Sequence, residues 1–478
     1  MSSIDPSLSI ANPEPKDTDA VQKLGLALAS LGLLVLFLAW GNVNIPASIG
    51  LPIALGGIFI GVAIYGARAY ANQPEGIKNN GVWLKGLTNR GVLGWVVGII
   101  LTGFYVLLYW YPEYIGYKAG GNEGLVRLFD PLSMFFKGTP ASQWFVYGTL
   151  YTLAITSLGI KFMYKYRHNR YQLKRTIVVM ISQFFLAYFI PEILAGLNYN
   201  DVTTASGEYL GYYNTDVKNI WPLDYDFFHN WQQDAFRQEA YQPIGVLFLI
   251  IGIAMFLIVT PVLTYYVGKR WYCSWVCGCG GLAETAGDPF RHLSSKKLSA
   301  WKLERWLIHG VMVFVFVMTA ATVYGYFWNT GEVFGLNIYN NFQKPYGFLI
   351  GAAFSGVIGV GFYPMLGNRV WCRFGCPMAG YMGIIQRFKS RFRITTNGGQ
   401  CISCGNCSTY CEQGIDVRAY AQKGQNIVRA SCVGCGICSA VCPRGVLKLE
   451  NGPLEGRIDG NDVLLGNDVD LMELVNQK

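Results

Sequence analysis

The chain has 478 residues, of which 52% are hydrophobic and only 14% are charged, and its formal net charge is +9. This composition excludes an ordinary soluble protein, because the charges gather between long apolar runs as they do in polytopic membrane proteins. We therefore interpret the positive charge as a signal of membrane topology and expect a lipid bilayer, and no nucleic acid, as partner.

Eight apolar segments are each long enough to cross a bilayer of about 30 Å. The first follows a polar leader and carries no cleavage pattern of a signal peptide, so we expect it to remain as a span. Tyr and Trp at several ends, such as Trp110 and Trp328, suit an aromatic belt. The expected spans are 24–40, 45–65, 92–111, 144–163, 176–197, 244–267, 306–328 and 346–366.

Lys and Arg are concentrated in the connections on one side of these spans, as at 165–175 and 269–305. Under the positive-inside rule, both termini and the cysteine-rich C-terminal part are expected on the cytoplasmic side of a bacterial inner membrane. The acidic and aromatic loop at 198–242 is expected on the outer side. It is interpreted as a packed cap in preference to a docking surface for a partner.

All thirteen cysteines lie between Cys273 and Cys442, and eight of them form two runs spaced C-x2-C-x2-C-x3-C. In bacterial ferredoxins, three thiolates of such a run bind one cubane cluster and the fourth reaches the other cluster. Structural zinc rarely uses eight cysteines in this order, and disulfides do not suit a cytoplasmic domain. The runs predict two [4Fe–4S] clusters, one on Cys401, Cys404, Cys407 and Cys442, the other on Cys432, Cys435, Cys438 and Cys411.

A second cysteine pattern occurs twice, in 268–278 (the first hook) and 367–377 (the second hook). Both read G-x-R-x-aromatic-C-x-aromatic-x-C after a span, which indicates a duplicated helix pair. Arg270 and Arg369 are expected to offset thiolate charge, and Cys279 belongs to neither copy. At one depth, the four hook thiols can hold a third iron–sulfur cluster; the alternatives are reactive thiol pairs, a metal-transfer site or buried apolar thiols. These four are Cys273, Cys277, Cys372 and Cys376.

The segments WCRFGCP at 371–377 and CISCGNCSTYCEQGIDVR at 401–418 resemble the membrane polyferredoxins of the NapH, NosR and CcoG type. The resemblance covers about 175–451 and implies cluster ligands at the eight ferredoxin cysteines and hooks at the four cysteines above. Three features depart from the family pattern. Gly278 replaces the proline of the first hook, Glu412 replaces the proline after Cys411, and the first four spans lie outside the resemblance.

These patterns predict a polytopic all-α membrane protein with a C-terminal α+β ferredoxin domain. The expected parts are an N-terminal four-helix extension at 1–174, a duplicated helix-pair domain at 175–396, a 2[4Fe–4S] ferredoxin domain at 397–451 and an acidic tail at 452–478.

The resemblance implies electron transfer between a cytoplasmic or quinol donor and a membrane or periplasmic redox pathway, with redox proteins as partners. Quinone is a candidate cofactor of a quinol dehydrogenase component. Glu192 is the candidate proton acceptor because it is a carboxylate within a span. A haem relay is not expected, since His309 has no histidine partner in another span. The alternative function is CcoG-like reduction or delivery of copper during assembly of a respiratory enzyme, because soft thiolates select Cu(I).

Overall fold

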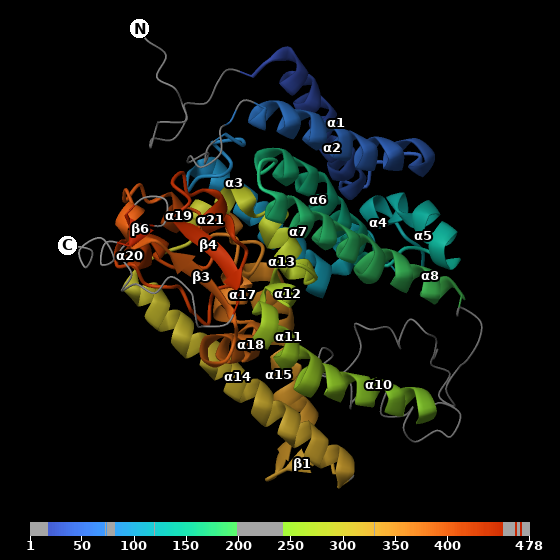
Figure 1. Ribbon diagram of the computed structural model, residues 1–478. Coiled ribbons are helices and arrows are strands. Elements are labelled where there is room, and N and C mark those ends of the chain that lie inside the picture. Colours follow the sequence, from blue (N-terminus) through green and yellow to red (C-terminus); the bar gives the residue numbers. More distant parts are fainter. Residues whose placement is uncertain are drawn as a thin grey trace, which may run out of the picture.

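The computed structural model describes residues 18–71, 73, 82–118, 120–197, 242–328, 330–452, 464–465 and 469–470. All of the expected cap except its last residue, 242, and most of the acidic tail lie outside these residues. Long helices account for most of the described chain, and a small domain with strands sits beside the start of the longest helix, α14 (Figure 1). This arrangement agrees with the predicted fold class.

Within the described residues, seven helical stretches are long and apolar enough to cross a membrane. They coincide with the first seven expected spans, with ends shifted by a few residues. In the fifth and sixth stretches, π-helical turns join two α-helical segments into one helix. The elements are α1 (Ala20–Trp40), α2 (Ala47–Tyr70), α3 (Val92–Trp110), α6 (Gln143–Lys165), α7 (Arg170–Ile181), η3 (Ser182–Phe189), α8 (Ile190–Leu197), α10 (Gln242–Ala254), η6 (Met255–Val259), α11 (Thr260–Val267) and α14 (Leu298–Phe327).

The eighth expected span, 346–366, is helical but broken into short pieces, so it is absent from the seven long helices. After a short hairpin the chain runs back from the far end of α14 to the second hook through these pieces. The count of spans is therefore approximate. The hairpin is formed by β1 (Glu332–Val333) and β2 (Leu336–Asn337), and the pieces are η8 (Tyr339–Gln343), α15 (Lys344–Tyr346), η9 (Gly347–Ile358) and α16 (Tyr363–Leu366).

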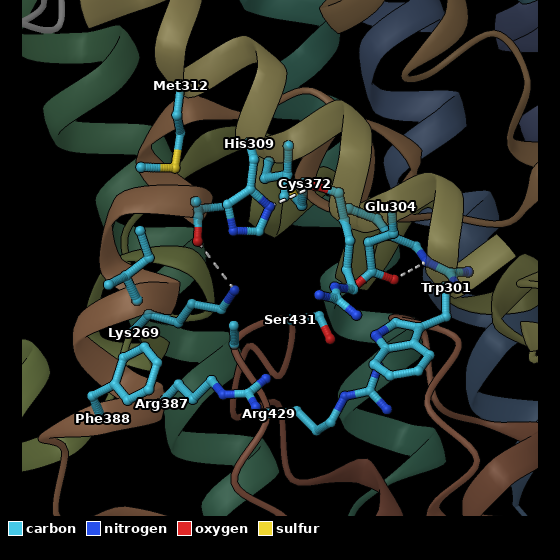
Figure 2. A pocket seen from close by; sticks show the side chains of 17 residues that line it. Lys269, Trp301, Glu304, His309, Met312, Cys372, Arg387, Phe388, Arg429 and Ser431 are labelled. Atoms are coloured by element: carbon cyan, nitrogen blue, oxygen red, sulfur yellow. Dashed lines mark hydrogen bonds and ion pairs between the residues drawn. The ribbon is translucent and has the colours of Figure 1, made fainter.

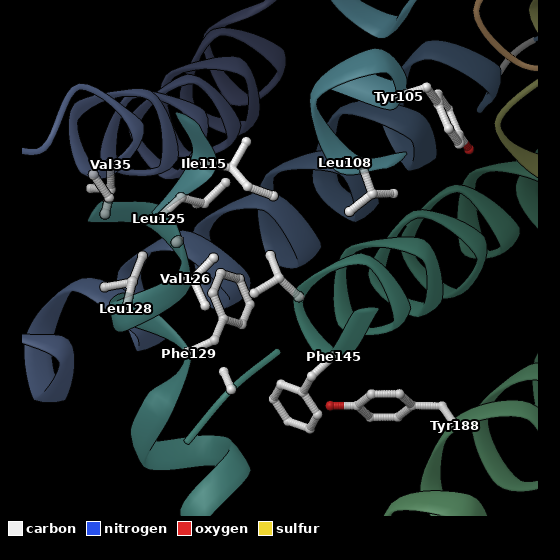
Figure 3. Close-up of a cluster of buried hydrophobic side chains, with 14 residues drawn as sticks. Val35, Tyr105, Leu108, Ile115, Leu125, Val126, Leu128, Phe129, Phe145 and Tyr188 are labelled. Atoms are coloured by element: carbon white, nitrogen blue, oxygen red, sulfur yellow. The ribbon is translucent and has the colours of Figure 1, made fainter. Parts of the chain in front are cut away.

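The first two helices pack closely because glycines line their contact. A Cβ atom on Gly25 would lie 2.9 Å from the carbonyl oxygen of Gly61 on the facing helix, so the backbones touch without side chains between them. Beside them, η2 (Pro112–Ile115), α4 (Gly124–Leu128) and α5 (Asp130–Lys137) connect α3 to α6. Figure 3 shows the buried cluster around Phe129 and Phe145 that joins these short helices to α1, α3 and α6. The N-terminal helices thus share one apolar core.

Each hook holds a short helix and a turn, and a second helix begins at its last residue. The connection from the first hook to α14 is the 3-10 helix η7 (Asp288–Leu293), which receives ion pairs from α6, a helix of the expected N-terminal extension. The hook helices are α12 (Arg270–Cys273) and α13 (Gly278–Thr285) in the first copy, and α17 (Val370–Phe374) and α18 (Pro377–Phe388) in the second.

The ferredoxin domain is closed by an antiparallel strand pair that joins its two ends. Strand β3 (Phe392–Thr396) pairs with β4 (Leu447–Asn451), with Phe392 opposite Asn451. The strand pair therefore includes residues that precede 397, where the ferredoxin domain is predicted to begin. Between the strands lie η10 (Gly398–Gln400), α19 (Asn406–Thr409), α20 (Val417–Gln422) and α21 (Ile437–Ala440), and β5 (Leu464–Leu465) and β6 (Val469–Asp470) follow in the tail.

Candidate electron-transfer site

The ferredoxin domain brings its eight motif cysteines together around two small cavities. One cavity is lined by Cys401, Cys404, Cys407 and Cys442, which we call the distal set. The other is lined by Cys411, Cys432, Cys435 and Cys438, which we call the proximal set. Each set combines three cysteines of one run with the fourth cysteine of the other run, in the pairing that the spacing predicts.

The two runs have the same local structure. Gly405 and Gly436 adopt left-handed φ angles of 79° and 74° and immediately precede α19 and α21. A residue with a Cβ atom avoids this conformation, so glycine allows the sharp turn between the second and third cysteines of each run. The backbone N–H of Ile415 donates to the Cys411 sulfur at 3.3 Å. Such N–H···S bonds contribute to the reduction potential of a cluster bound by that thiolate.

Among the described residues, no three His, Cys, Asp or Glu side chains lie close enough to hold a single metal ion. Mononuclear zinc needs its four ligands about 2.0–2.3 Å from one centre. A four-iron cluster is larger and spreads its thiolates over separate irons. The two enclosed sets of four thiols therefore fit a cluster better than a single ion.

The two hooks lie against each other. The Arg369 guanidinium of the second hook donates to the carbonyl oxygen of Cys273 at 3.0 Å and to the sulfur of Cys372 at 3.7 Å. Cys273 and Cys372 are buried, whereas Cys277 and Cys376 are partly exposed and immediately precede α13 and α18. The structure therefore places one arginine, Arg369, beside the hook thiols as the sequence suggests.

Arg270 has a different position from the one expected. Its guanidinium lies over the rings of Phe392, Trp275 and Tyr171, at 5.0, 5.4 and 5.6 Å from their centroids. It therefore packs the first hook against α7 and the ferredoxin domain, through cation–π contacts, and does not balance thiolate charge.

Cys279 lies beside Cys277 and is the exposed member of the pair. A hydrogen bond from the Cys279 thiol lowers the pKa of Cys277 to about 6, against the opposing effect of burial. By contrast, burial raises the pKa of Cys273 to about 12. The first hook therefore combines one thiol that ionises readily with one that stays protonated when no metal is bound.

The membrane helices and hooks hold the proximal set through the backbone of the second run. Four side chains donate to four consecutive carbonyl oxygens, of residues 432 to 435, at 2.7–3.0 Å. The donors come from α7, from Ser274 directly after α12, and from α18, so the second run has one fixed position relative to both hooks. The pairs are Gln386 with Cys432, Ser274 with Val433, Tyr171 with Gly434 and Gln172 with Cys435.

Glu412 connects the ferredoxin domain to the second hook. Its buried carboxylate accepts from Arg291 at 2.5 Å, Arg369 at 3.1 Å and Asn368 at 3.3 Å. Burial alone would raise its pKa, but Arg291 and Arg369 hold the pKa at about 2, so the group stays ionised. The sequence showed Glu412 only as a replacement for proline, and its arginine partners are distant in the chain.

Further buried ion pairs surround this contact. Asp288 pairs with Lys165 at 2.8 Å, Arg291 at 2.9 Å and Lys161 at 3.3 Å, and Arg175 pairs with Glu284. With Glu412 and Arg369, the network contains five cations and three carboxylates among the described residues. Cationic charge therefore exceeds anionic charge beside the proximal set.

Glu192 lies apart from the cysteines, on α8 at one side of the molecule (Figure 1). Its carboxylate forms an ion pair with Lys137 of α5 at 3.0 Å, and both side chains are almost buried. His309 donates from Nδ1 to the carbonyl oxygen of Arg305 within its own helix. The proton-acceptor role of Glu192 stays a prediction.

Comparisons with known proteins match the same parts of the chain. A family described as "4Fe-4S dicluster domain" matches residues 400–447, and one described as "4Fe-4S binding domain" matches twice, at 247–299 and 348–395, once over each hook. A protein of Escherichia coli (strain K12) named as an electron transport protein, YccM, is 26% identical over 185 residues, which is 36% of this chain. The chain spans about half of that relative's length, and no solved structure matches. Together with the apolar helices, these matches fit a membrane polyferredoxin family. The matches also support iron–sulfur electron transfer, and the geometry of the cysteine sets agrees with it.

Proposed function

We propose that the chain carries single electrons between a cytoplasmic or quinol donor and a redox pathway in the membrane or periplasm. A [4Fe–4S] cluster, when bound, supplies one-electron oxidation and reduction. The donor chemistry fits two such groups in the ferredoxin domain, because each cavity is lined by four thiols. In this proposal the distal and proximal sets are the two ligand sets.

One observation carries the proposed route: continuous packing connects the distal set, the proximal set and the hooks. Cys407 of the distal set shares a buried cluster with Cys432 and Cys438 of the proximal set. Cys435 of the proximal set packs in a second cluster with Cys273 of the first hook. Single electrons can therefore enter from solution at the distal set and reach the membrane boundary through closely packed protein.

The buried charges favour electrons at the proximal set. Lys161, Lys165, Arg175, Arg291 and Arg369 outnumber the carboxylates Glu284, Asp288 and Glu412 in this network. Positive charge near a cluster stabilises its reduced, more negative state. We expect the reduction potential at the proximal set to exceed that at the distal set, which biases electrons toward the hooks.

The hook cysteines are proposed to hold a third iron–sulfur cluster. The contacts of Arg369 with both hooks support this, because they bring Cys273 and Cys372 together beside a cation. The test is the iron content of the double variant Cys273→Ala/Cys372→Ala against Cys279→Ala. Loss of about four irons in the double variant alone supports the third cluster. Equal iron in the wild type and the double variant rules it out.

Copper handling is the second candidate function, and the contact between Cys277 and Cys279 favours it. One thiol of this pair is exposed and the other ionises readily, and soft thiolates select Cu(I). In this reading Cu(II) is the substrate, and it takes one electron to become Cu(I) at the first hook.

Two assays on the reconstituted protein separate these functions. In the first, quinol is added anaerobically to oxidised protein; in the second, Cu(II) is added to reduced protein, and the visible iron–sulfur absorbance is followed in both. Bleaching by quinol without a response to Cu(II) supports the quinol pathway. Rapid reoxidation by Cu(II) that is lost in Cys279→Ala supports copper reduction, and it contradicts the quinol proposal if quinol has no effect.

A further inference from the structure

A cavity of about 300 Å³ lies between α14, α18 and the segment at 429–431, away from the two cysteine cavities of the ferredoxin domain. Figure 2 shows its side chains pointing inward from these three segments, with Cys372 of the second hook at its edge. Its lining includes Cys372, a proposed ligand of the third cluster, but no cysteine of the distal or proximal set, and the other lining side chains have a different chemistry.

Positive charge dominates the lining. Five cationic side chains face the cavity and the one carboxylate among the lining residues, Glu304, is bound to Arg373 at 2.7 Å. The other four cations have no ion-pair partner among the described residues. A site with this excess favours a ligand that carries negative charge. The five cations are Lys269, Arg305, Arg373, Arg387 and Arg429.

Two buried polar groups show that the cavity is a formed site. Lys269 is only 1% exposed, and its ammonium group donates to the carbonyl oxygen of Ala379 at 3.4 Å, which leaves its other N–H groups available. The buried hydroxyl of Ser431 has no hydrogen-bond partner. In Figure 2 the Lys269 side chain reaches into the cavity, and Ser431 lies at its wall. A buried ammonium without an anion is costly, so a bound anion would stabilise this arrangement.

Aromatic rings hold the arginines at the rim. The guanidinium of Arg429 lies 4.7 Å from the ring centroid of Trp301, and the guanidinium of Arg305 lies 5.4 Å from the same centroid. Planar guanidinium groups bind phosphate oxygens through paired hydrogen bonds. Prior positioning of these groups lowers the entropic cost of binding such a ligand.

The remaining wall is apolar and continues into the lipid-facing surface of α14. Ile308, Met312, Ile384 and Phe388 line the cavity, and the next turn of α14 exposes Val313 and Phe316. The residues named on α14 belong to a helix that is apolar enough to cross a membrane. The cavity therefore joins a cationic floor to an apolar exit at the expected membrane boundary.

We propose that this cavity binds the headgroup phosphate of one anionic phospholipid. Lys269, Ser431 and the arginines donate to the phosphate oxygens, while the acyl chains leave along Ile308 and Met312. Basic pockets between membrane helices are known to take anionic headgroups. A free phosphate could make the same contacts with the cationic side chains, but it would leave the apolar exit empty. A phospholipid fills both parts of the cavity, so it is the favoured ligand.

Lipid retention by the intact chain tests this proposal. The protein in mild detergent is titrated with phosphatidylglycerol, phosphatidylcholine or inorganic phosphate, and bound molecules are counted by native mass spectrometry. We expect one tightly held phosphatidylglycerol per chain. Arg387→Gln and Arg429→Gln should each weaken its binding about fivefold. Lys269→Met should weaken it at least as much.

Lys389→Gln is the matched control, because Lys389 is exposed one residue beyond Phe388, outside the cavity lining, and the variant makes the same change of charge. It should bind phosphatidylglycerol like the wild type. The proposal is overturned if both lipids bind equally, if Lys389→Gln weakens binding as much as Arg387→Gln, or if inorganic phosphate binds as tightly as phosphatidylglycerol. The test uses no redox readout, so its result is independent of the proposed function.

Discussion

Glu412 is the residue that couples the ferredoxin domain most directly to the membrane part of the chain. It follows a proximal cysteine and forms ion pairs with Arg291 and Arg369 in a fully buried site. Glu412→Gln removes the anion and leaves both guanidinium groups buried without it. Breaking a buried pair in this way costs about 3–5 kcal/mol. The variant should therefore unfold at a distinctly lower temperature, measured by thermal unfolding in detergent.

Glu332→Gln is the comparison for this variant. Glu332 is exposed on β1, and its substitution removes the same negative charge. It should leave the melting temperature within error of the wild type. Equal stability of Glu412→Gln and Glu332→Gln would contradict the structural role assigned to Glu412.

His292 gives a prediction for pH dependence. Burial and, to a smaller extent, Lys296 lower its pKa to about 4, and its ring bonds to Asn89 at 3.1 Å. In the unfolded chain the His292 ring takes up a proton near pH 6.5. Between pH 6.5 and 4 the unfolded chain is therefore more protonated at this residue than the folded chain. The contribution of the neutral His292 ring to the free energy of unfolding is complete above pH 6.5 and is lost as the pH falls toward 4. The melting temperature should fall less steeply over this range in His292→Gln; parallel curves would contradict the assignment.

At the scale of elements, the two hooks depend on glycines that precede their short helices. Gly268 and Gly367 have φ angles of 71° and 94°, which other residues adopt only at a cost. A Cβ atom on Gly268 would also lie 2.7 Å from the Phe392 ring. Gly268→Ala should therefore destabilise the protein by more than the conformational cost of about 1–2 kcal/mol. Thermal unfolding measures the loss.

Gly310→Ala provides the control in the same class of substitution. Gly310 lies within α14, and no atom would lie within 4 Å of an added Cβ. Alanine there should be neutral or stabilise the helix by about 0.5–1 kcal/mol. If Gly268→Ala is tolerated as well as Gly310→Ala, the close packing of the first hook on β3 is not as described.

Local patterns sufficed to predict the seven long helices and the grouping of the eight ferredoxin cysteines into two sets of four, because apolar length and cysteine spacing act over short stretches of chain. That these sets bind clusters stays a prediction. Contacts between distant segments could not be predicted from local patterns. Arg175 with Glu284, Lys137 with Glu192, and Glu412 with Arg369 each join residues far apart in the sequence. Strand β3 was also missed, because its pairing with β4 decides its structure and lies at the other end of the domain.

At the scale of the whole molecule, the contact between the hooks constrains the topology. Arg369 touches Cys273, so both hooks lie at one face of the membrane part, and the chain leaves that face through α14 and must return to it. The broken helix from η8 to η9 is the return segment, which supports an even number of crossings. Together with the positive-inside rule, this predicts both termini in the cytoplasm of a bacterial cell.

Reporter fusions test this topology. A fluorescent protein at either terminus should be active, and alkaline phosphatase at the same points should be inactive. A phosphatase fused within the 198–242 loop should be active, as a positive control for export. Active phosphatase at the C-terminus would place the ferredoxin domain on the outer side and contradict a cytoplasmic donor.

The iron and sulfide content of anaerobically purified protein, with electron paramagnetic resonance of the reduced form, tests the central claim most directly. Two four-iron sites in the ferredoxin domain predict about eight irons per chain, or about twelve with a third cluster on the hooks. Cys404→Ala in the distal set and Cys435→Ala in the proximal set should each remove a different one of the signals. A full-length, folded chain that contains zinc or no iron would contradict the account.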